Sequence, residues 1–334
     1  MAESVAHPRD TAALEGQTAQ EEAFLSALDS GRLHHAWLLT GPEGVGKATF
    51  AYHAARRLLG AARDPAGSPL SASLNDPVSK LMAARSHPDL MVLERDGEDG
   101  KPRKVIPVDE ARRLPEFFSK APARAAYRVA IIDAADDLNI NAANAILKTL
   151  EEPPARGVLL LVSHSPGRLL PTIRSRCRTL SFRAPDADVA AQIVRRAAEV
   201  DGYDAARLVR MAGGAPGLAI RLAAMKALEV DDAAHEILNH LDHPQQAALL
   251  SLADGFRGVE GAERFQLLFE RLADRIRTMA VDQALAGTGE AGDLDRWAEA
   301  WETLVRLPRE AEAINLDRAD SFWTAIRALK AAAA

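Results

Sequence analysis

Short apolar runs alternate with helical patterns over the first half of the chain. The runs occupy residues 36–40, 88–94, 127–133, 157–163 and 179–183. Several are apolar on both faces, which is typical of strands that helices cover on each side. Alternating strands and helices predict βαβ units. The expected fold class is therefore α/β with a mainly parallel five-stranded sheet.

The helical pattern after the first run is the clearest one. Phe50, Ala54 and Leu58 recur four residues apart and would form one buried face. Two later stretches lack any periodicity and are predicted to be exposed loops. They are 61–77, which is rich in Pro, Gly and Ser, and the polar 95–104, which would form a turn between strands.

From Asp186 onward every pattern is helical. One helix opens behind Pro185, a second runs to the glycines of "AGGAPG", and Pro216 is placed to begin a third. Further amphipathic segments follow and predict a separate helical bundle. We predict three domains: an α/β core over 1–184, a small helical lid over 185–228 and a C-terminal helical domain over 229–334.

Composition and net charge restrict the classes of function that can be expected. The 334 residues carry a net charge of −6, so binding to DNA through overall basicity is not expected and a protein partner is favoured. The single cysteine, Cys177, excludes an internal disulfide and a multi-cysteine zinc site. The chain lacks an apolar run near the ~20 residues that span a bilayer, and its N-terminus lacks signal-peptide features. We expect a cytoplasmic protein.

The stretch "GPEGVGKAT" has GxxxxGK spacing between a predicted strand and a predicted helix. Glycines let backbone amides converge on phosphate, and the lysine reaches the outer phosphates. An alanine stands where a hydroxyl would bind Mg²⁺, and the threonine comes one residue late. Two interpretations stay open: a site that binds ATP or ADP weakly, or a retained turn. The candidate residues are Gly41, Pro42, Gly44, Val45, Gly46, Lys47, Ala48 and Thr49, with no metal assigned.

Asp133 ends the third apolar run, where a P-loop protein places a metal-binding carboxylate. Ala134 follows it, and alanine cannot accept a proton from water. Asp136 and Asp137 are predicted to cap the next helix rather than to replace the missing base. Asp133 is therefore interpreted as a vestige or a weak metal contact.

The stretch "LPTIRSRCRTLSF" places three arginines and Cys177 just before the last strand. Taken in isolation it indicates a solvated turn. No base lies near Cys177 in the sequence, so packing is favoured over a nucleophilic role.

Five stretches in order resemble the clamp-loader branch of the AAA+ family. They are "LEGQ", "HHAWLLTGPEGVGKAT", "IIDAADDLNINAANAILKTLEEPP", "LLLVSHSPGRLLPTIRSRC" and "GGAPGLAIRL", and together they cover 14 to about 222. The most specific part is "NAANAILKTLEEPP" followed by "TIRSRC". The last hundred residues match only as a helical domain of suitable length. The resemblance implies an AAA+ P-loop core, a helical lid and a C-terminal collar for oligomerisation.

The resemblance also implies roles for particular residues. Ser175, Arg176 and Cys177 match the SRC motif, whose arginine enters the ATP site of the neighbouring ring subunit as an arginine finger in trans. His164 falls at the sensor-1 position, and Leu218 occupies the position of the sensor-2 arginine. The family's zinc module is expected to be absent, because 61–77 has no cysteine.

Implied partners are the gamma/tau ATPase subunits and the delta subunit of a hetero-oligomeric ring. The sliding clamp and primer-template DNA would be reached through the complex, and no membrane is involved. Ala48, Ala134 and Leu218 stand where the metal-binding hydroxyl, the catalytic carboxylate and the sensor-2 arginine would be. The absence of these three groups favours a non-hydrolysing subunit in DNA replication. The alternatives are an active AAA+ ATPase with an unrecognised base and another P-loop nucleotide-binding enzyme. The SRC stretch and the long helical tail argue against the last.

Overall fold

The computed structural model describes residues 6–95, 103–243, 245–286 and 291–333. It divides into two compact units, Met1–Arg221 and Leu222–Ala334.

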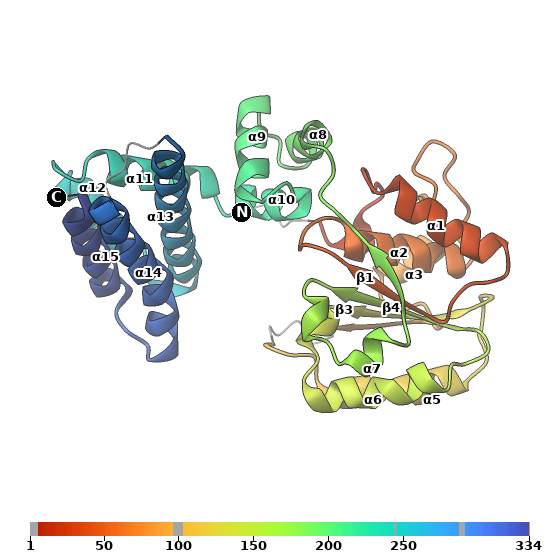
Figure 1. The fold of residues 1–334 in the computed structure, drawn as a ribbon. Coiled ribbons are helices and arrows are strands. Elements are labelled where there is room, and N and C mark those ends of the chain that lie inside the picture. The colour runs from red at the N-terminus through yellow and green to blue at the C-terminus, as the bar shows by residue number, and fades with distance from the viewer. Residues whose placement is uncertain (1–5, 96–102, 244, 287–290, 334) are drawn as a thin grey trace. The chain divides into compact units, whose positions relative to one another are not determined.

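A five-stranded sheet in the order β2-β3-β4-β1-β5 forms the centre of the first unit. Its strands are β1 (Ala36–Thr40), β2 (Leu90–Glu94), β3 (Arg128–Asp133), β4 (Gly157–Ser163) and β5 (Arg178–Ser181). Every strand pair is parallel. The central strands β1, β3 and β4 are almost wholly buried, because helices cover both faces of the sheet (Figure 1). The predicted α/β class with a parallel five-stranded sheet is confirmed.

Two helical layers make two separate cores. One layer holds α1 (Thr18–Asp29), α2 (Lys47–Leu58) and α3 (Pro77–Ala83), and the other holds α4 (Val108–Ala111), α5 (Leu114–Ser119), α6 (Ile140–Glu151) and α7 (Pro171–Arg174). Short 3-10 turns lie at η1 (Pro8–Asp10), η2 (Ala135–Asp137) and η3 (Pro166–Arg168). Phe50, Ala54 and Leu58 of α2 are buried in the first core, as their spacing predicted. Ile146 and Leu150 of α6 anchor the second.

Three further helices complete the first unit and lead out of it: α8 (Ala187–Ala197), α9 (Gly202–Met211) and α10 (Pro216–Ala224). The Asp201 side chain caps α9 by accepting from the Asp204 N–H at 2.8 Å. Gly213 and Gly214, both at positive φ, follow that helix, and Pro216 begins α10 as predicted. The proposed division of the chain into three domains remains a prediction.

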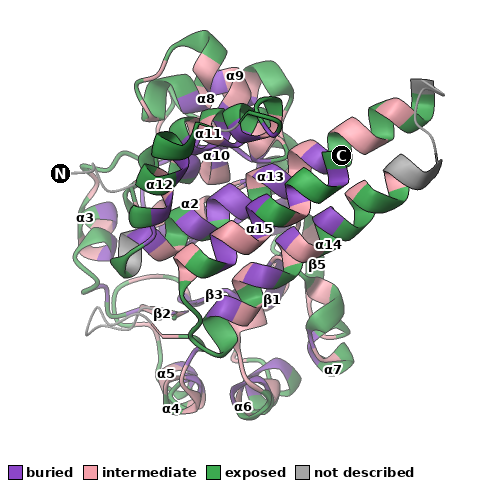
Figure 2. Ribbon diagram, turned by 90° about the vertical axis from the view of Figure 1, so that its left-hand side faces the viewer, coloured by how far each residue is buried: buried purple, intermediate pink, exposed green. Residues whose placement is uncertain are grey.

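The second unit is all helical, with α11 (Ala227–Asn239), α12 (Gln246–Asp254), α13 (Gly258–Ala286), α14 (Ala291–Ala313) and α15 (Arg318–Ala333). Buried and exposed positions alternate along α13, α14 and α15, as expected for amphipathic helices (Figure 2). Phe256 packs against Phe265 and Phe322, with ring centroids 5.3 and 5.4 Å apart. This confirms the predicted helical C-terminal region. Within the described ranges, the helices include none with the length and apolarity to cross a membrane.

The prediction of an exposed loop over 61–77 is wrong in part. Leu70 is buried in the first core, and its N–H donates to Glu21 Oε1 at 3.3 Å. Arg63 and Ala72 form an isolated antiparallel bridge. Ala61, Ser71 and Ala72 are buried as well, so much of the segment packs against the first unit. Most of the other predicted loop, 95–104, lies outside the described residues.

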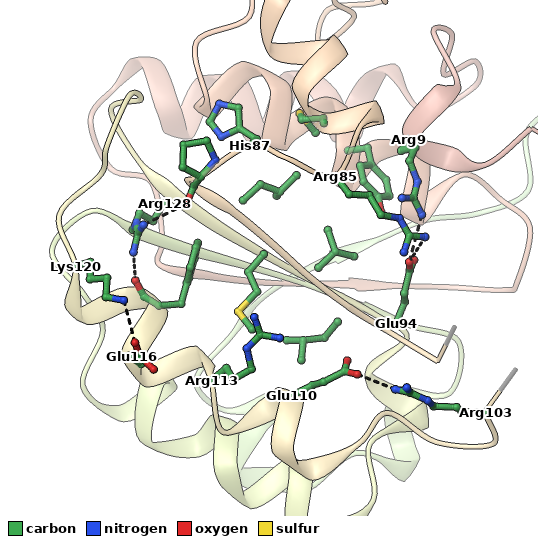
Figure 3. Close-up of a pocket in the computed structure, with 18 residues that line it drawn as sticks. Arg9, Arg85, His87, Glu94, Arg103, Glu110, Arg113, Glu116, Lys120 and Arg128 are labelled. Atoms are coloured by element: carbon green, nitrogen blue, oxygen red, sulfur yellow. Dashed lines mark hydrogen bonds and ion pairs between the residues drawn. The ribbon is translucent and has the colours of Figure 1, made fainter. Parts of the chain in front are cut away.

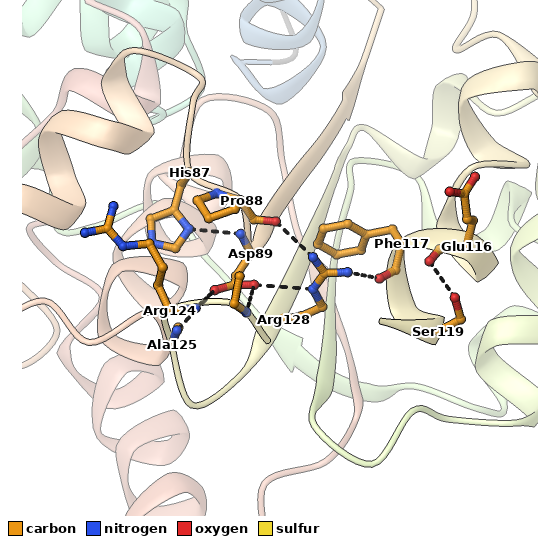
Figure 4. A network of polar contacts seen from close by, with 10 residues as sticks. His87, Pro88, Asp89, Glu116, Phe117, Ser119, Arg124, Ala125 and Arg128 are labelled. Carbon is orange, nitrogen blue, oxygen red and sulfur yellow. Dashed lines mark hydrogen bonds and ion pairs between the residues drawn. The ribbon is translucent and has the colours of Figure 1, made fainter. Parts of the chain in front are cut away.

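A buried ion pair fixes the segment that leads into β3 (Figure 4). Asp89 is fully buried and accepts backbone hydrogen bonds from Ala123, Arg124 and Ala125 at 2.7 to 3.1 Å. Arg128 Nε donates to the same carboxylate at 3.3 Å, and its guanidinium also donates to the Phe117 carbonyl. Burial alone would raise the pKa of Asp89, but these bonds outweigh it and lower the pKa. The carboxylate therefore stays charged and joins two elements far apart in sequence.

Candidate functional site

The glycine-rich loop connects the end of β1 to the start of α2, as its spacing predicted. Gly41, Gly44 and Gly46 all have positive φ, at 142°, 78° and 98°. A Cβ added at any of them would lie under 3.0 Å from an atom of this chain: the Phe182 carbonyl, the Leu218 N–H group and the Leu14 side chain, respectively. Backbone packing therefore requires glycine at Gly41 and Gly44, and the positive φ favours glycine at all three positions, whether or not a phosphate binds.

Lys47 is the first residue of α2 and is only 2% exposed. Its ammonium donates to the Gly41 carbonyl at 2.7 Å and to the Pro42 carbonyl. Burial lowers the pKa of Lys47 to about 8, against the charges of Asp133 and Glu43, which raise it. A phosphate would have to compete with the loop's own carbonyls for this ammonium.

A cavity of 480 Å³ lies beside the loop, and Ala48, Thr49, Asp133 and His164 all line it. The structure thus brings together the residues predicted for the phosphate loop, the carboxylate and the sensor-1 position. Ala48 offers no hydroxyl to a metal. Burial, followed by the charge of Glu94, raises the pKa of Asp133 to about 6, which weakens this carboxylate as a metal ligand near neutral pH.

The prediction that Asp136 and Asp137 cap the following helix is wrong. Asn139 caps α6 and accepts from the Ala142 N–H at 2.9 Å. Asp136 instead accepts from the Ser163 hydroxyl at 3.0 Å and from the backbone N–H groups of His164 and Ser165. Asp137 pairs with Arg95 at 3.1 Å. Both carboxylates are committed to structural contacts, so neither substitutes for a base at Ala134.

His164 follows β4 and is held by its backbone bond to Asp136 Oδ2 at 2.6 Å. Burial, and then the charge of Lys47, lower the pKa of its imidazole. The ring is therefore neutral at physiological pH. Its buried Nδ1 has no hydrogen-bond partner among the described atoms.

Helix α10 closes over the loop. The Gly217 N–H donates to the Gly44 carbonyl at 2.8 Å, and Arg221 forms an ion pair with Glu43 at 2.7 Å. Leu218 lies against Gly44. Its apolar side chain cannot form a hydrogen bond or an ion pair with a phosphate. Arg221 was missed by sequence reasoning, although it lies one helical turn beyond Leu218 and so on the same face.

The residues present do not fit a hydrolysing Mg²⁺–nucleotide site. Ala48 and Ala134 supply neither the hydroxyl nor the base, and the cations Lys47 and Arg221 are already paired within the chain. Over the ranges that the structure describes, no group of three or more His, Cys, Asp or Glu side chains is arranged to hold a metal ion.

A second cavity, of 530 Å³, runs along the edge strand β2 (Figure 3). Charged side chains on its rim are paired: Arg85 with Glu94 at 2.7 Å, and Lys120 with Glu116 at 2.9 Å. Charge beside an edge strand discourages pairing with other chains. This cavity is separate from the glycine-rich loop and contains none of the predicted site residues.

The three arginines of the SRC stretch have different surroundings. Arg174 is exposed at the end of α7, whereas Arg178 stacks over the Trp37 ring at 4.8 Å. Arg176 forms an ion pair with Glu151 at 3.0 Å and donates to the Thr172 carbonyl at 3.1 Å. Burial raises the pKa of the Cys177 thiol to about 12, which fits packing rather than nucleophilic chemistry.

Arg176 lies near the N-terminal ends of the strands, whereas the glycine-rich loop lies at their C-terminal ends. In the parallel register Arg178 is level with Trp37, and Ser181 is level with Thr40. The loop begins at Gly41, four residues beyond Trp37, so roughly 13 Å of strand separates it from the level of Arg178. Arg176 lies further back still. It is therefore remote from the phosphate loop of its own chain.

Comparison with known proteins gives a consistent family. The model described as "DNA polymerase III, delta subunit" matches residues 16–186. A DNA polymerase III subunit delta' from Pseudomonas aeruginosa is 38% identical over 204 residues, 60% of each chain. The corresponding subunit from Yersinia pestis is 31% identical over 257 residues, 74% of this chain and 72% of that protein. A DNA polymerase III subunit gamma/tau from Mycobacterium bovis is 32% identical over 214 residues, 63% of this chain and 36% of that protein.

The matched part of the chain thus spans 60% of the Pseudomonas relative and 36% of the Mycobacterium relative. The family model covers more than half of this chain, including the glycine-rich loop, Asp133 and Arg176. On that match, the chain belongs to the family described as DNA polymerase III, delta subunit.

Proposed function

We propose that this chain acts as a delta prime subunit of the bacterial DNA polymerase III clamp loader. In that role it is a ring subunit that does not hydrolyse ATP and supplies Arg176 to a neighbouring ATPase subunit during sliding-clamp loading. The single observation that carries the proposal is the position of Arg176 at the N-terminal ends of the strands, opposite the end at which its own phosphate loop lies. From there the guanidinium can reach a nucleotide only if another chain holds it.

The site beside the glycine-rich loop supports the absence of hydrolysis in cis. Lys47 donates to the loop's own carbonyls, and neither Ala48 nor Ala134 can assist a metal or a water. The loop glycines are explained by packing against Phe182, Leu218 and Leu14. The loop would then bind ATP or ADP weakly at most, and the chain would hold no zinc.

The names of the relatives, which are delta' and gamma/tau subunits, support a role in a clamp-loader complex. We propose that the chain assembles with gamma/tau and delta subunits as a component of the DNA polymerase III holoenzyme. The C-terminal helices would form the oligomerisation collar, and contact with the sliding clamp and primer-template DNA would be made through the complex. This role places the protein in the cytoplasm.

Reconstitution of the complex with Arg176→Ala tests the trans role. An arginine finger is worth about 10³ to 10⁵ in rate at the site that it serves. We expect the complex to lose all of the DNA-stimulated ATP turnover that this one site contributes. Assembly of the complex should be unchanged. Arg174→Ala, which alters an exposed arginine two residues away, is the matched control. Equal activity of the two variant complexes would overturn the finger assignment.

The isolated chain tests the second part of the proposal. Purified alone, it should show no ATP turnover above a Lys47→Ala control, since the cis site lacks its catalytic groups. Turnover typical of an AAA+ motor that Lys47→Ala abolishes would favour the alternative of an active ATPase.

A further inference from the structure

We infer that Glu151 is a positioning residue for Arg176, holding the guanidinium in the orientation in which it meets the neighbouring subunit. The inference rests on the proposed function, because it concerns how this chain presents its arginine finger. Glu151 is the last residue of α6 and lies 25 residues before Arg176 in the sequence.

Two elements hold the guanidinium at two different nitrogens. Glu151 Oε1 lies 3.0 Å from Nη2, and the Thr172 carbonyl of α7 accepts from Nη1 at 3.1 Å. The Ser175 hydroxyl lies 3.5 Å from the same Nη1. An arginine has five N–H donors in a rigid planar fork. Anchoring one hydrogen on each terminal nitrogen fixes the plane of the fork and leaves other donors for a phosphate.

The carboxylate is itself carried by a firmly placed helix. Asn139 caps the start of α6, and Ala142, Ile146 and Leu150 are buried in the core beneath it. Because Leu150 is 2% exposed, the position of the next residue is well defined. The C-terminal end of a helix also carries partial negative charge, which favours a nearby guanidinium. Groups built on such rigid elements hold functional side chains more precisely than loops do.

The exposure of the pair indicates orientation rather than stability as its role. The side chains of Arg176 and Glu151 are 36% and 50% exposed. Ion pairs with this much access to water contribute little to folding stability. They can still restrict a long side chain that would otherwise have to be ordered when the neighbouring subunit docks. Loss of that restriction typically lowers the equilibrium constant of an interaction by about two- to ten-fold.

Glu152 provides a matched control. It has the same charge and lies one residue along the chain, but it is not paired with Arg176 in the described part of the structure. Glu151→Gln and Glu152→Gln remove the same charge from the same helix end, so any general electrostatic effect should be common to both.

The experiment measures DNA-stimulated ATP hydrolysis by the reconstituted clamp loader carrying Glu151→Gln, Glu152→Gln, Glu151→Asp, Arg176→Ala or Glu151→Gln with Arg176→Ala. We expect Glu151→Gln to lower, by about two- to ten-fold, the part of kcat that Arg176→Ala removes, with little change in KM for ATP. Glu152→Gln should match the unaltered complex, and Glu151→Asp should restore part of the loss. Adding Glu151→Gln to Arg176→Ala should have no further effect. The urea unfolding midpoint of each isolated variant should stay unchanged, which separates orientation from folding.

The outcomes separate this inference from the function on which it rests. If Arg176→Ala has no effect, the proposed function itself fails. If Arg176→Ala lowers activity but Glu151→Gln does not, or raises it, only the positioning role is overturned. The same conclusion follows if Glu151→Gln and Arg176→Ala have independent, multiplicative effects, because Glu151 would then act without Arg176.

Discussion

The two ends of the strands in the central sheet differ in how their polar groups are used. At the C-terminal ends of the strands, Lys47 donates to the carbonyls of its own loop, and Asp136 accepts three bonds from the last residue of β4 and the two residues after it. At the N-terminal ends, Arg176 is partly exposed and is held by one carboxylate, one carbonyl and the Ser175 hydroxyl. Lys47 and Asp136 thus form their bonds within the chain, whereas the Arg176 guanidinium is partly open to solvent.

The packing of Phe182 and Leu218 against the loop requires Gly41 and Gly44 whether or not the loop binds or hydrolyses a nucleotide. If Arg176 acts on a neighbouring subunit as proposed, it needs an accurate position and no nucleotide site of its own. Three substitutions at and around the glycine-rich loop test this contrast, and they are given in order of decreasing expected effect.

Gly41→Ala should have the largest effect. Its φ is 142°, and an added Cβ would meet the Phe182 carbonyl at under 3.0 Å, so the backbone of the loop or of the segment after β5 must shift. We expect a loss of about 3 kcal/mol or more in the free energy of unfolding, measured with urea. Gly31→Ala is the control, because Gly31 also has positive φ but has no atom within 4 Å of the added Cβ. It should lose only about 1 to 2 kcal/mol. Equal losses at the two positions would show that packing does not require the loop glycines.

Asp133→Asn should have an intermediate, pH-dependent effect. Burial, followed by the charge of Glu94, raises the pKa of Asp133 from an ordinary value of 3.8 to about 6 in the folded chain. Between these values the folded chain keeps a proton that the unfolded chain has lost, so wild-type stability falls as pH rises through this window. Asparagine does not titrate. The stability of Asp133→Asn relative to wild type should therefore rise by about 1 to 3 kcal/mol between pH ~4 and pH ~7.5.

Urea unfolding at the two pH values would measure this change. A relative stability of Asp133→Asn that does not vary with pH would mean that the surroundings of Asp133 do not raise its pKa.

Glu43→Gln should have the smallest effect. The pair with Arg221 is about half exposed on both sides, at 51% and 45%, so its coupling free energy should be below about 1 kcal/mol. A double-mutant cycle with Arg221→Ala would measure that coupling. A value above about 2 kcal/mol would make this ion pair, rather than the backbone contact between Gly217 and Gly44, the main link between α10 and the loop.

Most of the fold could be predicted because its signals are local. Runs that are apolar on both faces predicted the buried strands, and the four-residue spacing of Phe50, Ala54 and Leu58 predicted α2. The segment 61–77 was misjudged because Leu70 is its only large apolar side chain in the core, amid residues that otherwise indicate a loop. Such a residue carries no periodicity, so only tertiary contacts such as the one with Glu21 of α1 reveal it.

The sequence indicated which residues lie together at the candidate site, but not their hydrogen-bond partners. Lys47 follows the glycine-rich loop and Asp133 ends an apolar run, and both line one cavity. The role of Asp136 was wrong because its partners Ser163, His164 and Ser165 lie 27 to 29 residues away. The contact of Arg176 with Glu151 is equally non-local. Capping rules consider only neighbouring residues, so they cannot detect such contacts.

The buried carboxylate of Asp89 has a consequence for backbone dynamics. Ala123, Arg124 and Ala125 lie in an irregular segment before β3, where amide hydrogens would normally exchange with solvent within seconds. Here all three amides donate to one fully buried carboxylate that Arg128 also holds. Their deuterium uptake should accordingly follow the opening of the sheet itself, and this short stretch would report on the unfolding of the whole α/β layer.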